Sequence, residues 1–279
     1  MPWMAIALFF FVTFIFLAFF KGTSIEYLTN DYLLGLFKNT FILSFLTAFI
    51  SALIAMPLAI LVTFYDFPGR KFFSWSLSLS IAFPAYVYAF IYVGIFEYSS
   101  PISSYLRDFN IALPSIKNLF GASIILSMAL FPYIYLLLRV KLASVGLDLF
   151  RAAKSLGNNS TTSIFKVIIP SLLPVVIAGM TLVIFETIAD FGGVSTLRIE
   201  TFTVGIYNAW FGYQSYFSAA RLAGYLLIFV FVIIFIAKFY ESKQANLAQK
   251  TSEVFEGMEL VPYKRFLATF YCGSIFTIV

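Results

Sequence analysis

The sequence predicts an all-α membrane protein that crosses the bilayer several times. Of its 279 residues, 61% are hydrophobic and only 11% are charged, whereas soluble domains carry about 25% charged residues. The apolar residues gather in runs of about 20, the length that a helix needs to cross the hydrocarbon core of a bilayer. Because a soluble core of this size does not bury so much apolar surface, the bilayer must act as the solvent.

Six apolar runs are long enough to be transmembrane helices. They cover residues 3–20, 38–64, 72–96, 119–138, 171–190 and 218–239. The first run has no basic segment before it and no small-residue cleavage site after it, so we expect a retained helix rather than a signal peptide. A seventh apolar stretch, residues 266–279, is too short to span and counts as a partial seventh helix.

The distribution of Lys and Arg predicts that the N-terminus lies in the cytoplasm. With that orientation, most of the 18 basic residues fall in inner segments, as the positive-inside rule requires. Six spans then return the chain to the cytoplasm at a polar segment, residues 241–265. The net charge of +5 therefore reflects membrane topology and does not indicate a nucleic-acid partner.

The residue inventory argues against several kinds of chemistry. The chain has no His and one Cys, Cys272, so we expect no zinc or other metal site, no disulfide framework and no Cys–His nucleophile. It also lacks a phosphate-binding loop of the form GxxxxGK[ST], so we expect no ATP hydrolysis by this chain. The triplet Asp-Phe-Gly at 190–192 has none of the other kinase motifs beside it. We therefore predict no catalytic residues and no cofactor within this chain.

A polar loop, residues 141–170, separates the fourth apolar run from the fifth. Its first half carries an apolar stripe at helical spacing: Leu149, Phe150, Ala153 and Leu156. Gly157 is placed to end that helix, and Asn-Asn-Ser at 158–160 supplies turn and N-cap residues for a second short helix. Two interpretations stay open: an amphipathic loop that lies on the headgroups, or a docking element whose stripe enters a groove on a partner.

The spacing within this loop resembles the EAA loop of permease subunits of bacterial ABC importers. The matching positions are Ala152, Ala153, Gly157, Val167, Ile169 and Pro170. The position that usually holds Glu is Arg151, which reverses the sign of any contact made there. The resemblance implies the MetI-like permease fold and a loop that docks in a cleft of a cytoplasmic ATPase. It also implies that ATP and magnesium bind to that partner.

Three further segments are similar to ferric-iron permeases: "IAFPAYVYAF", "LFPYIYLLLRV" and "ETIADFGGVSTLRIETFTVGIYNAWFG". This similarity implies ferric iron as the substrate, with thiamine, sulfate, molybdate and polyamine permeases as near alternatives. Two other classes stay open. An ion-coupled secondary transporter would use a proton or sodium gradient in place of ATP, and a membrane scaffold would show no substrate-dependent flux.

Two acidic residues, Glu186 and Asp190, lie near the outer end of the fifth apolar run. Residues four apart share one face of a helix, and acids within a span usually face the interior of a bundle because exposure to lipid is costly. One interpretation is a polar rim or a salt bridge to Arg198 or Arg221. The other is a gate that attracts cations along the translocation path.

The resemblance also implies partners and a location. We expect cytoplasmic ATP-binding subunits, a periplasmic or extracellular substrate-binding protein, membrane lipid and a second permease half, all at the bacterial plasma (inner) membrane. Ferric-iron permeases often carry two halves fused in one chain. We therefore expect a transmembrane domain over residues 1–240, a cytoplasmic linker over 241–265 and the start of a second half over 266–279, with a homodimer as the alternative.

Overall fold

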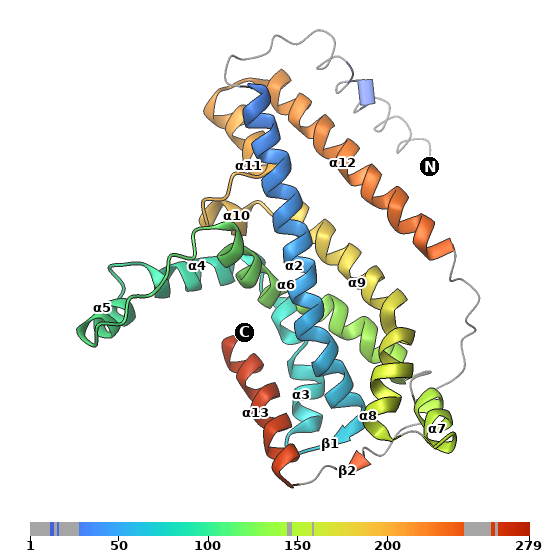
Figure 1. The fold of residues 1–279 in the computed structure, drawn as a ribbon. Coiled ribbons are helices and arrows are strands. Elements are labelled where there is room, and N and C mark those ends of the chain that lie inside the picture. Colours follow the sequence, from blue (N-terminus) through green and yellow to red (C-terminus); the bar gives the residue numbers. More distant parts are fainter. Residues whose placement is uncertain are drawn as a thin grey trace.

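The computed structural model describes residues 12–13, 16, 28–143, 147–157, 159–242, 258–259 and 262–279. The predicted first span, 3–20, lies almost wholly outside these residues. In the rest, three helices pack together as a core (Figure 1): α2 (Asn30–Phe64), α6 (Leu119–Lys141) and α9 (Ile169–Ala189). A fourth long helix, α12 (Tyr216–Ser242), lies beside α9.

The core helices approach closely because small residues line their contacts. On α2 these residues recur every three or four positions and are fully buried: Ser44, Ala48, Ser51, Ala55 and Ala59. On α9, a Cβ added at Gly179 would lie 3.0 Å from the Cγ1 atom of Ile134 on α6. Small residues of this kind let helix backbones approach one another in membranes, where dispersion contacts replace the hydrophobic effect as the source of stability.

Four described helices are long and apolar enough to cross a membrane: α2, α6, Ile164–Ala189 and Tyr216–Ala237. They confirm the predicted helices over 38–64, 119–138, 171–190 and 218–239. Three of the core prolines, Pro57, Pro132 and Pro174, lie inside continuous helices. These prolines leave their helices unbroken.

The apolar run predicted as a transmembrane helix over residues 72–96 is divided into separate helical segments. The chain forms α3 (Arg70–Ser76), a 3₁₀ turn (Leu79–Ala82) and α4 (Ala85–Phe96), and the helical segments on either side of the break are bent by 92°. The break falls at Pro84, and Phe83 before it has an extended backbone with φ −102° and ψ 127°. A residue before proline is forced out of the helical region by the pyrrolidine ring, which explains the position of the break.

The C-terminal residues pack against this broken span. A short strand β1 (Tyr65–Asp66) pairs in parallel with β2 (Met258–Glu259). The following helix α13 (Pro262–Ile278) lies beside α3 (Figure 1), and the ring of Phe276 lies 5.2 Å from that of Phe72. Helix α13 thus begins within the segment predicted as linker, and Cys272 is fully buried in this contact region.

The remaining helices are short and connect the long ones. They are α5 (Pro101–Asp108), α7 (Leu147–Ser155), α8 (Ser160–Ser163), α10 (Gly192–Thr196) and α11 (Phe202–Tyr207), together with π-helical turns over Ile164–Ile168 and Asn208–Gly212. Helices α7 and α8 lie at the end of the bundle that also holds β1 and β2, away from α11 (Figure 1).

Candidate functional site: the coupling loop and the acidic end of helix α9

The predicted coupling loop forms two short helices at one end of the bundle. Helix α7 is attached to the core through Phe150, whose ring lies 5.4 Å from the ring of Phe64 at the end of α2. Phe150 is 3% exposed and Ala153 is 4% exposed. These two residues of the predicted stripe therefore face the core. The hypothesis that the whole stripe enters a groove on a partner is wrong for them.

The turn after α7 has the conformation that the sequence predicts. Gly157 has a φ of +84°, in the left-handed region that residues with a Cβ rarely adopt. Asn159 then caps α8, because its Oδ1 atom accepts a hydrogen bond from the backbone N–H of Thr162 at 2.7 Å. Asn158, the first residue of the predicted turn, lies outside the described residues.

A π-helical turn joins α8 to α9. Over Ile164–Ile168 the backbone makes wider turns than an α-helix, a local feature that is frequent at functional sites. Ile164 and Ile168 are buried and Val167 is half-buried. Ile169 and Pro170, also part of the predicted motif, form the first turn of α9, where a missing proline N–H costs nothing.

Six of the exposed residues of this loop form a surface that we name the inner docking face, after the role that we propose for it below. It consists of Arg151, Ala152, Lys154, Leu156, Phe165 and Lys166. Leu156 is 83% exposed and Phe165 is 66% exposed, so two large apolar side chains stand among three cations. The docking face is therefore mixed in character, where the sequence predicted an apolar stripe.

Hydrogen bonds tie the neighbouring helix ends together on the same side. Arg70 caps the end of α2, with its Nε donating to the carbonyl of Val62 at 2.9 Å and its Nη2 to that of Thr63 at 3.0 Å. Tyr135 on α6 donates from its hydroxyl to the carbonyl of Ser74 at 3.1 Å, and Arg139 donates to the same oxygen. The ends of α2, α3 and α6 on the side of the loop thus form one cross-linked unit.

At the other end of α9, the two predicted acids have different partners. Glu186 is exposed, and its Oε1 atom accepts a hydrogen bond from the hydroxyl of Tyr133 on α6 at 3.2 Å. Asp190 ends α9, and its Oδ2 atom accepts a hydrogen bond from the backbone N–H of Val194 in α10 at 2.9 Å. The carboxylate of Asp190 therefore caps the N-terminal end of α10, whereas that of Glu186 stays open to its surroundings.

No ion pair joins Glu186 or Asp190 to Arg198 or Arg221, within the part of the chain that the structure describes. The ion pair recorded there joins Lys117 to Glu97 instead. Over the same residues no group of three His, Cys, Asp or Glu side chains is arranged to hold a metal ion. The salt-bridge interpretation of the acidic pair is therefore not supported, and Glu186 is the more accessible of its two carboxylates.

Two contact residues at these sites were missed by sequence reasoning. Phe64 anchors α7, and Tyr133 holds Glu186. Both lie inside apolar runs, where the sequence does not indicate which residue an aromatic side chain contacts. Their pairing joins positions 86 and 53 residues apart along the chain, so only the tertiary structure reveals it.

These features define an integral membrane protein with a short helical loop clamped to one end of a helix bundle. Residues 55–253 match the family described as the inner membrane component of binding-protein-dependent transport systems. This match covers more than half of the chain, so the chain belongs to that family, which is the family of ABC importer permeases that the coupling loop predicted.

Relatives in the same family differ in the transport systems that they serve. The chain is 24% identical to the sulfate transport system permease protein CysT of Escherichia coli (strain K12), over 61% of this chain and 60% of CysT. It is also 24% identical to the Fe(3+)-transport system permease protein FbpB 2 of Haemophilus influenzae, over 79% of this chain and 40% of FbpB 2. The chain thus spans about 60% of the length of CysT and 40% of the length of FbpB 2, less than two thirds of either relative.

A solved structure shares the fold. The crystal structure of an amino acid ABC transporter with histidines matches 79% of this chain and 100% of its own, with a TM-score of 0.55. The sequence identity is 17%, so this likeness shows the fold alone.

Proposed function

We propose that this chain is the membrane-crossing subunit of an ATP-driven importer. In this role it receives movement from a cytoplasmic ATPase at the inner docking face. The observation that carries the proposal is the loop of α7, Gly157 and α8, which keeps Leu156 and Phe165 exposed while Phe150 fixes it to the core. Membership of the binding-protein-dependent permease family supports the same role.

The proposed coupling has two routes out of the loop. One runs through the contact of Phe150 with Phe64 to the end of α2. The other runs through the π-helical turn, whose buried Ile164 and Ile168 lead directly into α9. Because α2 and α9 both pack on α6, a displacement of α7 acts on all three core helices. A substrate-binding protein on the outside and a second permease half complete the proposed assembly, in which both sides bias one conformational equilibrium.

For the substrate we propose a small inorganic ion, with ferric iron ahead of sulfate. The similarity to FbpB 2 and to CysT supports both ions. Glu186 favours the cation, because an exposed carboxylate on a core helix attracts a cation and repels a dianion. In the proposed assembly, the exposed side of α9 near Glu186 faces the translocation path.

Uptake by cells that express the transport system tests the substrate and the energy source together. Radioactive ferric iron and radioactive sulfate are supplied separately, first with ATP available and then with ATP depleted while the proton and sodium gradients are kept. We expect ATP-dependent iron uptake that falls severalfold in Glu186→Gln. Uptake that survives ATP depletion would contradict the ABC importer, and ATP-dependent sulfate uptake unaffected by Glu186→Gln would contradict iron.

Copurification with the ATPase tests the docking face. Leu156→Asp places a charge at an apolar position of this face, so we expect loss of the copurifying ATPase and of uptake. Leu34→Asp is the matched control, because Leu34 is 65% exposed near the opposite end of α2. Equal copurification in the two variants would show that residue 156 lies outside the interface.

A further inference from the structure

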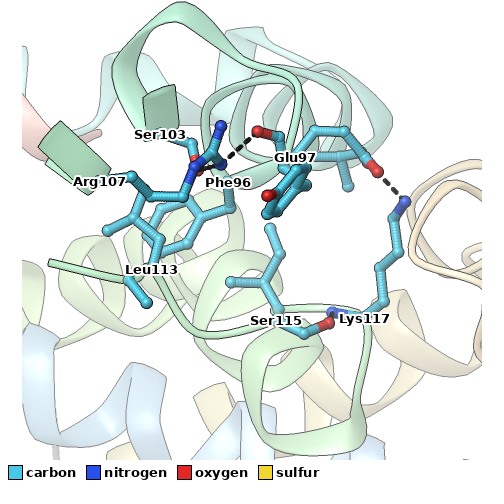
Figure 2. Close-up of a pocket in the computed structure, with 11 residues that line it drawn as sticks. Phe96, Glu97, Ser103, Arg107, Leu113, Ser115 and Lys117 are labelled. Carbon is cyan, nitrogen blue, oxygen red and sulfur yellow. Dashed lines mark hydrogen bonds and ion pairs between the residues drawn. The ribbon is translucent and has the colours of Figure 1, made fainter. Parts of the chain in front are cut away.

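A pocket lies at the C-terminal end of α4, away from the bend at Pro84, and the proposed function does not use it. The pocket lies between the last turn of α4, helix α5 and the segment 109–118, and its volume is about 280 Å³ (Figure 2). Its apolar part is formed by Val93, Phe96, Leu113 and Ile116. Two cationic side chains, Arg107 and Lys117, reach it from opposite sides (Figure 2).

Only one of these two cations is neutralised. Lys117 forms an ion pair with Glu97, with 2.6 Å between Nζ and Oε2. The hydrogen bond from Lys117 holds the pKa of Glu97 below its usual range, so Glu97 is ionised near neutral pH. No carboxylate among the described residues forms an ion pair with Arg107. The pocket therefore keeps one net positive charge.

The guanidinium of Arg107 is held in place by neutral groups. It lies 3.8 Å from the centre of the Tyr98 ring. Its Nη1 atom donates to the carbonyl of Tyr98 at 2.6 Å and to the hydroxyl of Ser103 at 3.1 Å, and its Nη2 atom donates to the hydroxyl of Ser104 at 3.1 Å. These bonds use three of the five N–H donors of a guanidinium. Within the described part of the chain, the other two donors have no hydrogen-bond partner and can bind an external anion.

The pocket lies where two apolar segments end. Residues 85–96 and 119–138 contain no charged residue. Most residues that line the pocket lie between these two segments in the sequence. Three aromatic side chains beside it are largely exposed: Tyr98 at 75%, Tyr105 at 64% and Phe109 at 60%. Aromatic side chains gather at the boundary between hydrocarbon and water. These exposed aromatic side chains favour a position of Arg107 at the level of the lipid headgroups.

We propose that this pocket binds the phosphate of an anionic phospholipid. A guanidinium with two free donors matches two oxygens of a phosphodiester, and Phe96, Leu113 and Ile116 offer an apolar surface to the glycerol and the first carbons of the acyl chains. A free phosphate ion offers the same oxygens but gains nothing from that surface. An acidic segment of a protein partner would have to reach down to headgroup level, which makes lipid the better match.

Native mass spectrometry of the purified chain in neutral detergent tests this proposal. The probes are phosphatidylglycerol and phosphatidylcholine, which differ in net charge. We expect the wild-type chain to retain phosphatidylglycerol in preference, and Arg107→Gln to bind it about tenfold more weakly, the loss typical of a hydrogen bond to a charged group. Arg107→Lys keeps the positive charge but loses the paired N–H donors of the guanidinium. Its affinity for phosphatidylglycerol should lie between those of the wild type and Arg107→Gln. Lys38→Gln, which removes an exposed cation outside the pocket, should match the wild type.

A second measurement does not depend on the folding of an Arg107 variant. Leu113→Trp places a fluorophore in the pocket, and we expect brominated phosphatidylglycerol to quench it more strongly than brominated phosphatidylcholine. Equal quenching by the two lipids, or equal retention of phosphatidylglycerol by Arg107→Gln and wild type, would overturn the proposal. Displacement of the lipid by millimolar inorganic phosphate would also overturn it, in favour of a free anion. None of these readouts requires transport, so they can fail or succeed independently of the proposed function.

Discussion

The segments before and after α9 are held by different means. Before α9, the turn between α7 and α8 depends on the backbone of Gly157, and a Cβ added there would meet no atom within 4 Å. At the outer end, the chain is fixed by the side chain of Asp190, which caps α10, and by Thr203, whose hydroxyl donates to the carbonyl of Asp190 at 2.9 Å. The turn at Gly157 has free space where a Cβ would lie, whereas the turn at Asp190 is hydrogen-bonded to both α10 and α11.

This difference has a consequence for how force passes through the molecule. A turn that is held by its own backbone conformation keeps its shape while the whole loop moves against a partner. A turn that is bonded to neighbouring helices keeps its position relative to them. We therefore expect the inner end of α9 to move with α7 and the outer end to stay fixed to α10 during transport.

The largest effect is expected from detaching α7. Phe150→Ala removes a buried ring and its contact with Phe64, and such substitutions cost about 3–5 kcal/mol when a cavity is left behind. We expect the chain to stay folded, because α2, α6 and α9 pack extensively on one another, but uptake to fall by more than tenfold. Limited proteolysis within residues 141–170 measures the detachment. Phe165→Ala, which truncates an exposed ring nearby, is the control for proteolysis alone, and wild-type protease resistance in Phe150→Ala would contradict the anchoring role.

A smaller effect is expected from the turn itself. Gly157→Val places a β-branched residue at a positive φ, which costs more than the 1–2 kcal/mol (roughly) of an ordinary residue in this region. Gly157→Asn should be nearly neutral, because Asn tolerates this conformation. Since no atom crowds the site, size alone cannot explain a difference between the two variants. Uptake and ATPase copurification that are equal in Val and Asn variants would show that the turn's conformation is unimportant.

The smallest of the three effects is expected at the outer end. Asp190→Ala removes a helix cap, at a cost of about 0.5–2 kcal/mol. Asp190→Asn keeps an acceptor for the N–H of Val194 and should retain most of the stability. Thermal unfolding in detergent measures the order wild type, Asn, Ala. If both variants unfold like the wild type, Asp190 is free for the gating role that the sequence suggested, and the contrast between the two ends of α9 disappears.

The predicted site residues illustrate how far local patterns reach. Gly157 was recognised because a glycine after a helical stripe signals a left-handed residue, and this property belongs to the residue itself. The pattern does not show, however, whether the apolar stripe of α7 faces a partner or the core of its own chain. Whether Phe150 faces a partner or its own core depends on Phe64, which is far away in the sequence. Likewise, the spacing of Glu186 and Asp190 predicted a shared face, but the helix ends at Ala189 and the side chain of Asp190 bonds to the next helix.

The sequence by itself determined the membrane environment, four of the long helices, the position of the coupling loop and the family. Each of these depends on composition, on the length of an apolar run or on spacing within about 20 residues, all of which are local. Only the tertiary structure decided that residues 70–96 break at Pro84 while Pro57, Pro132 and Pro174 stay within continuous helices. The reason is that a proline removes one hydrogen bond wherever it stands, and neighbouring helices decide whether the remaining contacts hold the helix together. Packing also decided which face of α7 is left for a partner, because the exposed face is whatever the core does not cover.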